Sequence, residues 1–132
     1  MHKRATNPST MPPPAGYSQI IEVAGGTTIH IAGQVAWDET SALVGEGDFE
    51  AQARQVFGNV VKALEAAGAT PSDLVKIRIY VVDHDPEKLA IFRRVRDEIL
   101  NADPPPVSTL VGVEQLALPD LLIEVEAVAV VG

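Results

Sequence analysis

Apolar and polar residues follow two different periods along this chain, and each period predicts one kind of element. Between residues 48 and 67, apolar side chains recur every three or four positions, as on one face of an α-helix: Phe49, Ala53, Val56, Phe57, Val60, Leu64 and Ala67. The segment 85–100 repeats this spacing with Leu89, Phe92, Val95 and Ile99. Asp48 and Asp85 precede the two segments as candidate N-caps. The pattern therefore predicts two amphipathic helices.

Shorter segments are rich in β-branched residues or alternate between apolar and polar positions, which is typical of strands. We expect strands at residues 17–23, 27–35, 74–82, 107–113 and 121–131. The first two flank "AGG", which predicts a hairpin with a tight turn. The order β-β-α-β-α-β-β favours an α+β fold, with both helices on one face of a mixed sheet. We expect a single domain, 1–132, in which the Pro-rich residues 1–15 form an extended N-terminal arm.

The last strand, "LLIEVEAVAVV", contains two acidic residues in an otherwise apolar segment. Glu124 and Glu126 are two residues apart, so both point to the same face, beside Leu122, Val128 and Val130. That face is too apolar for water at both ends, which favours a symmetric oligomer that buries it. Two neighbouring carboxylates raise the pKa of at least one and suit proton transfer, or they pair with Lys76 and Arg78 on a neighbouring strand.

Composition limits the class of protein. The chain has 132 residues, no cysteine and a net charge of −8, which argues against general affinity for nucleic acid or anionic lipid. The absence of cysteine also excludes thiolate chemistry and a disulfide framework. No secretory signal pattern and no apolar run of membrane-spanning length are present. We therefore expect a cytoplasmic protein without a membrane partner.

Other catalytic and binding patterns are weak. The three histidines, His2, His30 and His84, do not pair with other ligands at a metal-binding spacing. No G-x-S-x-G motif supports a catalytic serine, and "GEGDFE" places acids where a phosphate would bind. The basic run Arg93, Arg94 and Arg96 is interpreted as a solvated helix face.

Five segments occur in an order that resembles the RidA/YjgF family, also called endoribonuclease L-PSP-like proteins. These segments are "AGYSQ", "IAGQV", "EAQARQVFGNVVKALEAAGA", "DLVKIRIYVVD" and "LIEVEAVAV". The resemblance implies a chorismate-mutase-like fold and a homotrimer whose sheets form a central barrel, with a cleft between each pair of subunits. Enzymes of the best-known branch hydrolyse imines or enamines made from amino acids to 2-oxo acids and ammonia, without a cofactor.

The same resemblance implies roles for several residues. Tyr17 lines the cleft, Gly33 is the glycine of an S-G-Q motif, and Glu124 positions the water used for hydrolysis. Family enzymes hold the substrate carboxylate with an arginine, at the position where this chain has Val107, followed by Ser108 and Thr109. Arg93 aligns with a cleft asparagine and offers a replacement charge.

This chain departs from the family motifs at three further points that matter for function. The Gly-Pro before the cleft tyrosine is Ala15-Gly16, and the serine of S-G-Q is Ala32. Since valine has neither charge nor donor, the carboxylate clamp is absent. The primary hypothesis is a divergent hydrolase acting on a small imine, enamine or related C–N bond. The alternative is a non-catalytic ligand-binding or regulatory trimer, whereas a ribonuclease is disfavoured by the negative charge.

Overall fold

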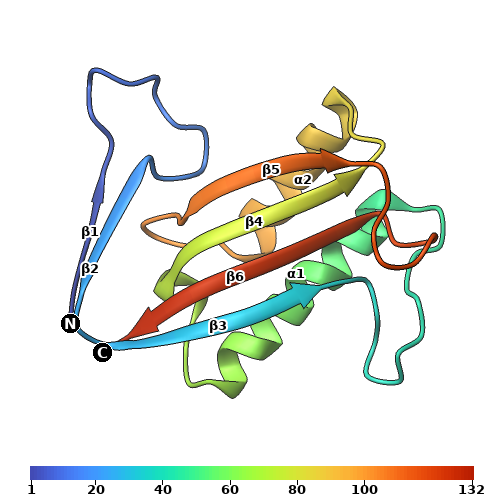
Figure 1. Ribbon diagram of the computed structural model, residues 1–132, viewed down its shortest axis with the longest axis horizontal. Coiled ribbons are helices and arrows are strands. Elements are labelled where there is room, and N and C mark those ends of the chain that lie inside the picture. Colours follow the sequence, from blue (N-terminus) through green and yellow to red (C-terminus); the bar gives the residue numbers. More distant parts are fainter.

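Strands β6 and β4 are the two central strands of the main sheet in the computed structural model, which describes residues 1–132 (Figure 1). The elements are β1 (His2–Thr6), β2 (Ile20–Ala24), β3 (Thr27–Gln34), α1 (Phe49–Ala66), β4 (Leu74–Val82), α2 (Pro86–Ile99), β5 (Val107–Val113) and β6 (Ile123–Val131). The sheet order is β3-β6-β4-β5. β6 is antiparallel to both neighbours, and β4 and β5 are parallel, so the sheet is mixed as predicted.

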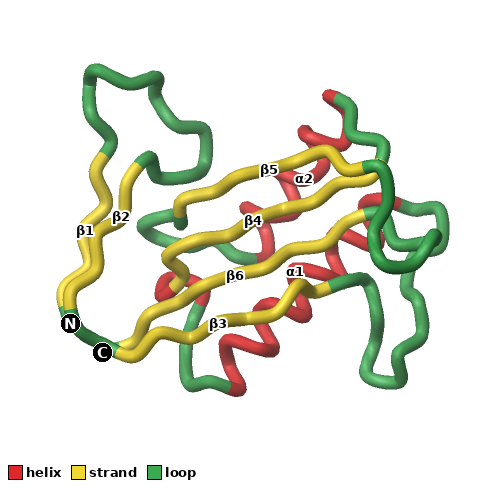
Figure 2. The backbone as a smooth tube through the Cα atoms, viewed as in Figure 1, coloured by secondary structure: helices red, strands yellow, loops and turns green.

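Both predicted helices form close to their predicted limits. The side chain of Asp48 accepts a hydrogen bond from Ala51 N (3.0 Å), and Asp85 accepts one from Lys88 N (2.8 Å). The helices lie on the same face of the sheet (Figure 2). They contact each other through Phe57 and Phe92, whose ring centroids are 5.9 Å apart. Neither helix is long and apolar enough to cross a lipid bilayer.

Alternation along β6 sets the position of the core. Ile123, Val125, Ala127 and Ala129 are buried beneath the helices. The intervening residues Glu124, Glu126 and Val128 point to the opposite face, where no element of the same chain covers the sheet (Figure 1). We call this uncovered side the open face. It confirms the prediction of two helices on one face, and it leaves apolar and acidic side chains together on the other.

The N-terminal region differs from the prediction. Residues 2–6 form β1, which pairs antiparallel with β2 in a separate two-stranded sheet beside the main one (Figure 1). The expected hairpin of β2 with β3 is wrong, because the two strands lie in different sheets. Gly25 and Gly26, both at positive φ (77° and 83°), turn the chain from one sheet into the other. β2 therefore pairs with β1, which is more distant in sequence, instead of with β3, which follows it directly.

Candidate functional site

Glu124 and Gly33 lie against each other on the open face. Glu124 is the first acidic residue of β6, and Gly33 lies where the pairing of β3 with β6 shifts register between Ile31 and Gln34. A Cβ atom on Gly33 would overlap the Glu124 carboxylate, so only glycine allows this close approach. The structure thus brings together two of the residues that the sequence resemblance singled out.

The Glu124 carboxyl is half-buried and has no hydrogen-bond donor from the chain. Burial raises its pKa, and the negative charge of Glu126 raises it further. A carboxyl with a raised pKa and open lone pairs can accept a proton from water or from a ligand near neutral pH.

Glu126 has a different environment. Its Oε1 accepts a hydrogen bond from the Tyr80 hydroxyl (2.6 Å), and this hydrogen bond is the largest cause of the raised pKa of Tyr80. No ion pair joins Glu126 to Lys76 or Arg78, the alternative that the sequence offered, although Arg78 is the cross-strand neighbour of Glu126. The two acids therefore differ: Glu126 is hydrogen-bonded to a tyrosine, and Glu124 has no donor from the chain.

Lys76, Arg78 and Glu126 line a shallow pocket of about 230 Å³ on the open face. The Nε atom of Arg78 is buried there without a hydrogen-bond partner. Half-buried Val128 and Val107 lie in the same cross-strand row as Lys76. The open face thus combines charged groups with apolar side chains that a single chain leaves uncovered.

A second group of predicted site residues lies where β5 begins. The Ser18 hydroxyl donates to Pro105 O (2.5 Å), and Ser18 N donates to Pro106 O (3.2 Å). These bonds fix the backbone next to Tyr17 to the two prolines that precede Val107. Ser108 and Thr109 follow on β5, where Thr109 shares the open face with Val107 and Ser108 points to the helix side.

The two groups are far apart within one chain. Val107 is paired with Lys76 on one edge of β4, and Glu124 is paired with Tyr80 on the other edge. Four residues along β4 and two strand spacings separate them, a distance of about 16 Å. No small ligand can contact both side chains in one chain, so a site that uses both needs a second subunit.

Arg93 lies apart from both groups. It projects from α2 on the helix side of the sheet, exposed and without a hydrogen bond or ion pair. Its neighbour Arg94 is bound to Glu50 Oε1 (2.7 Å). Arg96, which was also assigned to a solvated face, is instead buried, with only 6% of its surface exposed. The sequence interpretation of the basic run is therefore correct for two of the three arginines.

Trp37, Asn59 and Lys62 line a wider groove next to Gly33, of about 460 Å³, that the sequence analysis missed. Asn59 Nδ2 donates to Trp37 O (2.9 Å), which fixes the loop after β3 to α1. Trp37 remains 37% exposed, and the chain contains no other tryptophan. The sequence signal for this groove was a large aromatic residue, Trp37, shortly after the strand predicted at 27–35. No group of three or more histidine, cysteine or acidic side chains is positioned to hold a metal ion.

Comparison with known proteins identifies the family. The family model described as Endoribonuclease L-PSP matches residues 8–131. The chain therefore belongs to the RidA/YjgF family. The Rid family protein YyfB of Yersinia pestis has a similar structure, with a TM-score of 0.92 and 46% identity over 99% of this chain and 100% of that one. This likeness confirms the predicted α+β fold.

Two relatives and one further structure carry names that bear on function. A RutC family protein of Pyrococcus horikoshii is 38% identical over 89% of this chain and 90% of its own. A 2-iminobutanoate/2-iminopropanoate deaminase of Dermatophagoides farinae is 29% identical over 98% and 97%. The structure of Escherichia coli TdcF with bound serine matches with a TM-score of 0.70 and 26% identity, over 83% and 85% of the chains.

The raised pKa of Glu124 predicts a pH-dependent contribution to the stability of this RidA/YjgF protein. The folded state binds the proton more tightly than the unfolded state, so stability falls as the pH rises from the ordinary value of 4.5 through the raised value. Glu124→Gln removes this loss. The variant should melt at a higher temperature than the wild type at about pH 7.5, and the difference should shrink below the unfolded-state pKa. A variant that melts lower than the wild type at neutral pH would contradict this sign.

Proposed function

We propose that this protein hydrolyses a small imine, enamine or related C–N bond in a cleft between the subunits of a homotrimer. The observation that carries the proposal is the Glu124 carboxyl, held over Gly33 with a raised pKa and no donor from the chain. The reaction consumes one water and releases ammonia and a carbonyl compound. It needs a base, a bound water and an exposed C=N carbon, but no redox step.

Glu124 would act by moving protons. As the water oxygen bonds to the imine carbon, the carboxylate accepts a water proton, and the C=N electron pair moves to nitrogen, which takes up a proton. The carbon–nitrogen bond then breaks, the carbonyl forms and ammonia leaves. A carboxyl with a raised pKa is a better base for this exchange than a fully solvated one, and it can return the proton to nitrogen.

The separation of the two residue groups supports the trimer. Val107 lies about 16 Å from Glu124 in one chain, so a cleft that contains both has to combine two chains. Covering the open face would also remove Val107, Val111 and Val128 from water. Burial of such partly exposed apolar area is the usual driving force of stable oligomers.

The substrate class is narrowed by Val107. The named activity of the Dermatophagoides farinae relative is on 2-imino acids, and the Escherichia coli neighbour is described with serine bound, so small carboxylate-bearing molecules are the starting point. At position 107 this chain lacks the guanidinium that forms a bidentate pair with a carboxylate. We therefore propose that its substrates are small imines or enamines other than the usual amino-acid-derived ones.

The same valine supports a second candidate function. A trimer that keeps the cleft but cannot clamp a carboxylate could bind a small ligand without turning it over and serve a regulatory role. The two functions differ in one observable, which is ammonia release. Action on RNA, suggested by the name of the family model, is disfavoured because the net charge of −8 repels a polyanion.

The proposed assembly predicts a molecular mass. Light scattering coupled to size exclusion should give about three times the chain mass of 14.0 kDa, because each cleft needs two chains and the open face needs cover. A monomer at micromolar concentration would contradict both the assembly and the location of the cleft.

The two glutamates should separate catalysis from stability. Glu124→Gln removes the base and should lower ammonia release from a panel of small imines by about 10²- to 10⁴-fold, while the trimer mass is unchanged. Glu126→Gln is the matched control: it weakens the hydrogen bond from Tyr80 and should lower the melting temperature while activity per folded trimer is retained. If Glu126→Gln abolished activity and Glu124→Gln did not, the wrong carboxylate would have been assigned.

Val107→Arg tests the missing clamp. A desolvated bidentate carboxylate contact is worth on the order of 2–5 kcal/mol, or about 30- to several-thousand-fold in rate. The variant should gain activity on 2-iminobutanoate generated in the assay, and Val107→Lys, with the same charge but no planar fork, should gain less. Substantial wild-type activity on 2-iminobutanoate that neither substitution alters would overturn the assignment of position 107. No ammonia release by any variant would favour the ligand-binding function.

A further inference from the structure

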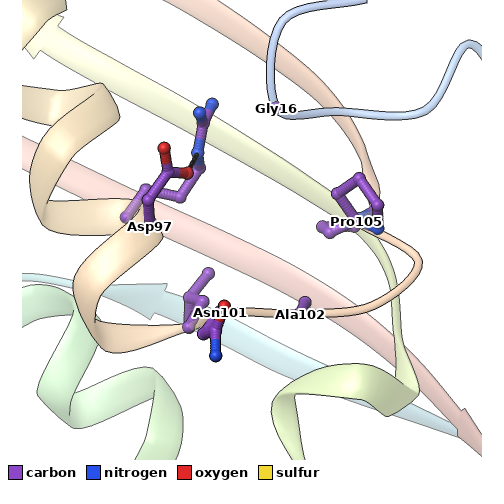
Figure 3. Close-up of a pocket in the computed structure, with 8 residues that line it drawn as sticks. Gly16, Asp97, Asn101, Ala102 and Pro105 are labelled. Carbon is purple, nitrogen blue, oxygen red and sulfur yellow. Dashed lines mark hydrogen bonds and ion pairs between the residues drawn. The ribbon is translucent and has the colours of Figure 1, made fainter.

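A pocket distinct from the Glu124 site lies at the C-terminal end of α2, next to the segments that carry Tyr17 and Val107. It has a volume of about 150 Å³ and is lined by Gly16, Arg96, Asp97, Asn101, Ala102 and Pro105, among others. The residues come from three parts of the chain: the last turn of α2, the loop that leads into β5, and the loop before β2 (Figure 3). The pocket holds about ten times the space that one water molecule requires, so it admits a molecule of a few non-hydrogen atoms.

The pocket contains the guanidinium of Arg96, a largely buried residue whose terminal N–H groups make no hydrogen bond within the chain. Arg96 is 6% exposed, and its guanidinium carbon lies 5.2 Å from the centroid of the Phe92 ring. Its Nε donates to Asp97 Oδ1 (2.9 Å), but its terminal nitrogens have no acceptor within the chain. A guanidinium has five N–H donors, and the terminal nitrogens of Arg96 are not fully buried, so they face the pocket and the solvent in it. The terminal N–H groups are thus set to bind an acceptor that enters the pocket.

Gly16 makes this arrangement possible. A Cβ atom at position 16 would overlap the terminal atoms of the Arg96 guanidinium, and the φ of 77° excludes proline. Family motifs that the sequence resembles have proline at this position, immediately before the cleft tyrosine. The glycine at residue 16 and the position of the guanidinium are therefore linked by packing, because the absence of a side chain at 16 leaves space for Arg96 beneath the loop.

The charge around the pocket is balanced. Asp97 lies beside the guanidinium, and the C-terminal end of α2 adds partial negative charge (Figure 3). A simple anion would be attracted by Arg96 and repelled by these groups. A ligand with a carboxylate and an ammonium group can satisfy both, with the carboxylate on the guanidinium and the ammonium near Asp97 and the helix end.

From these contacts we infer that the Arg96 pocket is a binding site for a small zwitterionic α-amino acid. The site lies on the helix side of the sheet, and Glu124 points to the open face, so the inference goes beyond the proposed function. The volume restricts the ligand to amino acids with short side chains. Arg96 binds the carboxylate, and Asp97 binds the ammonium group.

Amide chemical shifts test the site with defined probes. L-alanine, titrated into the full-length protein, should shift the ¹H–¹⁵N signals of Gly16, Asn101 and Ala102. Propionate and ethylammonium each keep only one of the two charges and should bind at least about tenfold more weakly. Arg96→Gln should weaken L-alanine binding by at least about tenfold, whereas Arg93→Gln on the same helix should leave it unchanged.

Three further variants separate the effects of the ammonium contact, of the space at residue 16 and of the open face. Asp97→Asn should weaken L-alanine binding but should not weaken propionate binding, because the variant loses the ammonium contact and also the negative charge that repels an anion. Gly16→Ala retains every charge and should still weaken binding by displacing the guanidinium, which keeps the test valid if Arg96→Gln misfolds. Glu124→Gln should bind L-alanine as the wild type does, even if no imine is ever hydrolysed. The inference is overturned if L-alanine shifts no signals at tens of millimolar, shifts only signals near Gly33, or binds Arg96→Gln equally well.

Discussion

A central strand that is hydrogen-bonded on both edges but covered on only one face is the constraint from which the remaining features follow. β6 pairs with β3 and β4, so its backbone is satisfied within the chain. Its side chains alternate, and the helices bury one set completely. The second set stays on the open face, where two glutamates lie next to valines. This mixture suits both contact with water and the proposed oligomer, in which a second subunit would cover the face.

The same strand also explains why the two acids differ. Tyr80, across from Glu124 in register, reaches diagonally to Glu126, and this hydrogen bond leaves Glu124 without a donor. Gly33 lets Glu124 lie flat against β3, where burial rather than a partner controls its proton affinity. The difference in chemistry between neighbours two residues apart is thus produced by the strands on either side of β6.

Local patterns in the sequence predicted the elements that depend on local interactions. The two helices follow from their apolar stripes and from the capping residues Asp48 and Asp85, and β5 and β6 follow from alternation. The pairing of β1 with β2 was not predictable in this way. A long loop joins the two strands, and β3, which follows β2 directly, was the more obvious partner for β2. Burial of Arg96 likewise depends on two distant loops, so its helix position alone indicated a solvated side chain.

The candidate site shows a similar division. Glu124 and Gly33 could be named from motifs, and the sheet register brings them together. The sequence did not predict the partner of Glu126. Lys76, Arg78 and Tyr80 all lie on the same face of β4, and only the side-chain conformations select the tyrosine. The groove beside Trp37 depends on how the loop after β3 folds against α1, which no short-range pattern specifies.

The close packing of residue 16 on Arg96 also makes these two positions depend on each other. A side chain at position 16 would occupy the space of the guanidinium, and the positive φ excludes proline whatever the space. A larger residue at position 16 therefore requires the arginine side chain to adopt another conformation. The two positions, 80 residues apart in sequence, are thus energetically coupled, and the effects of substitutions at them are not expected to add.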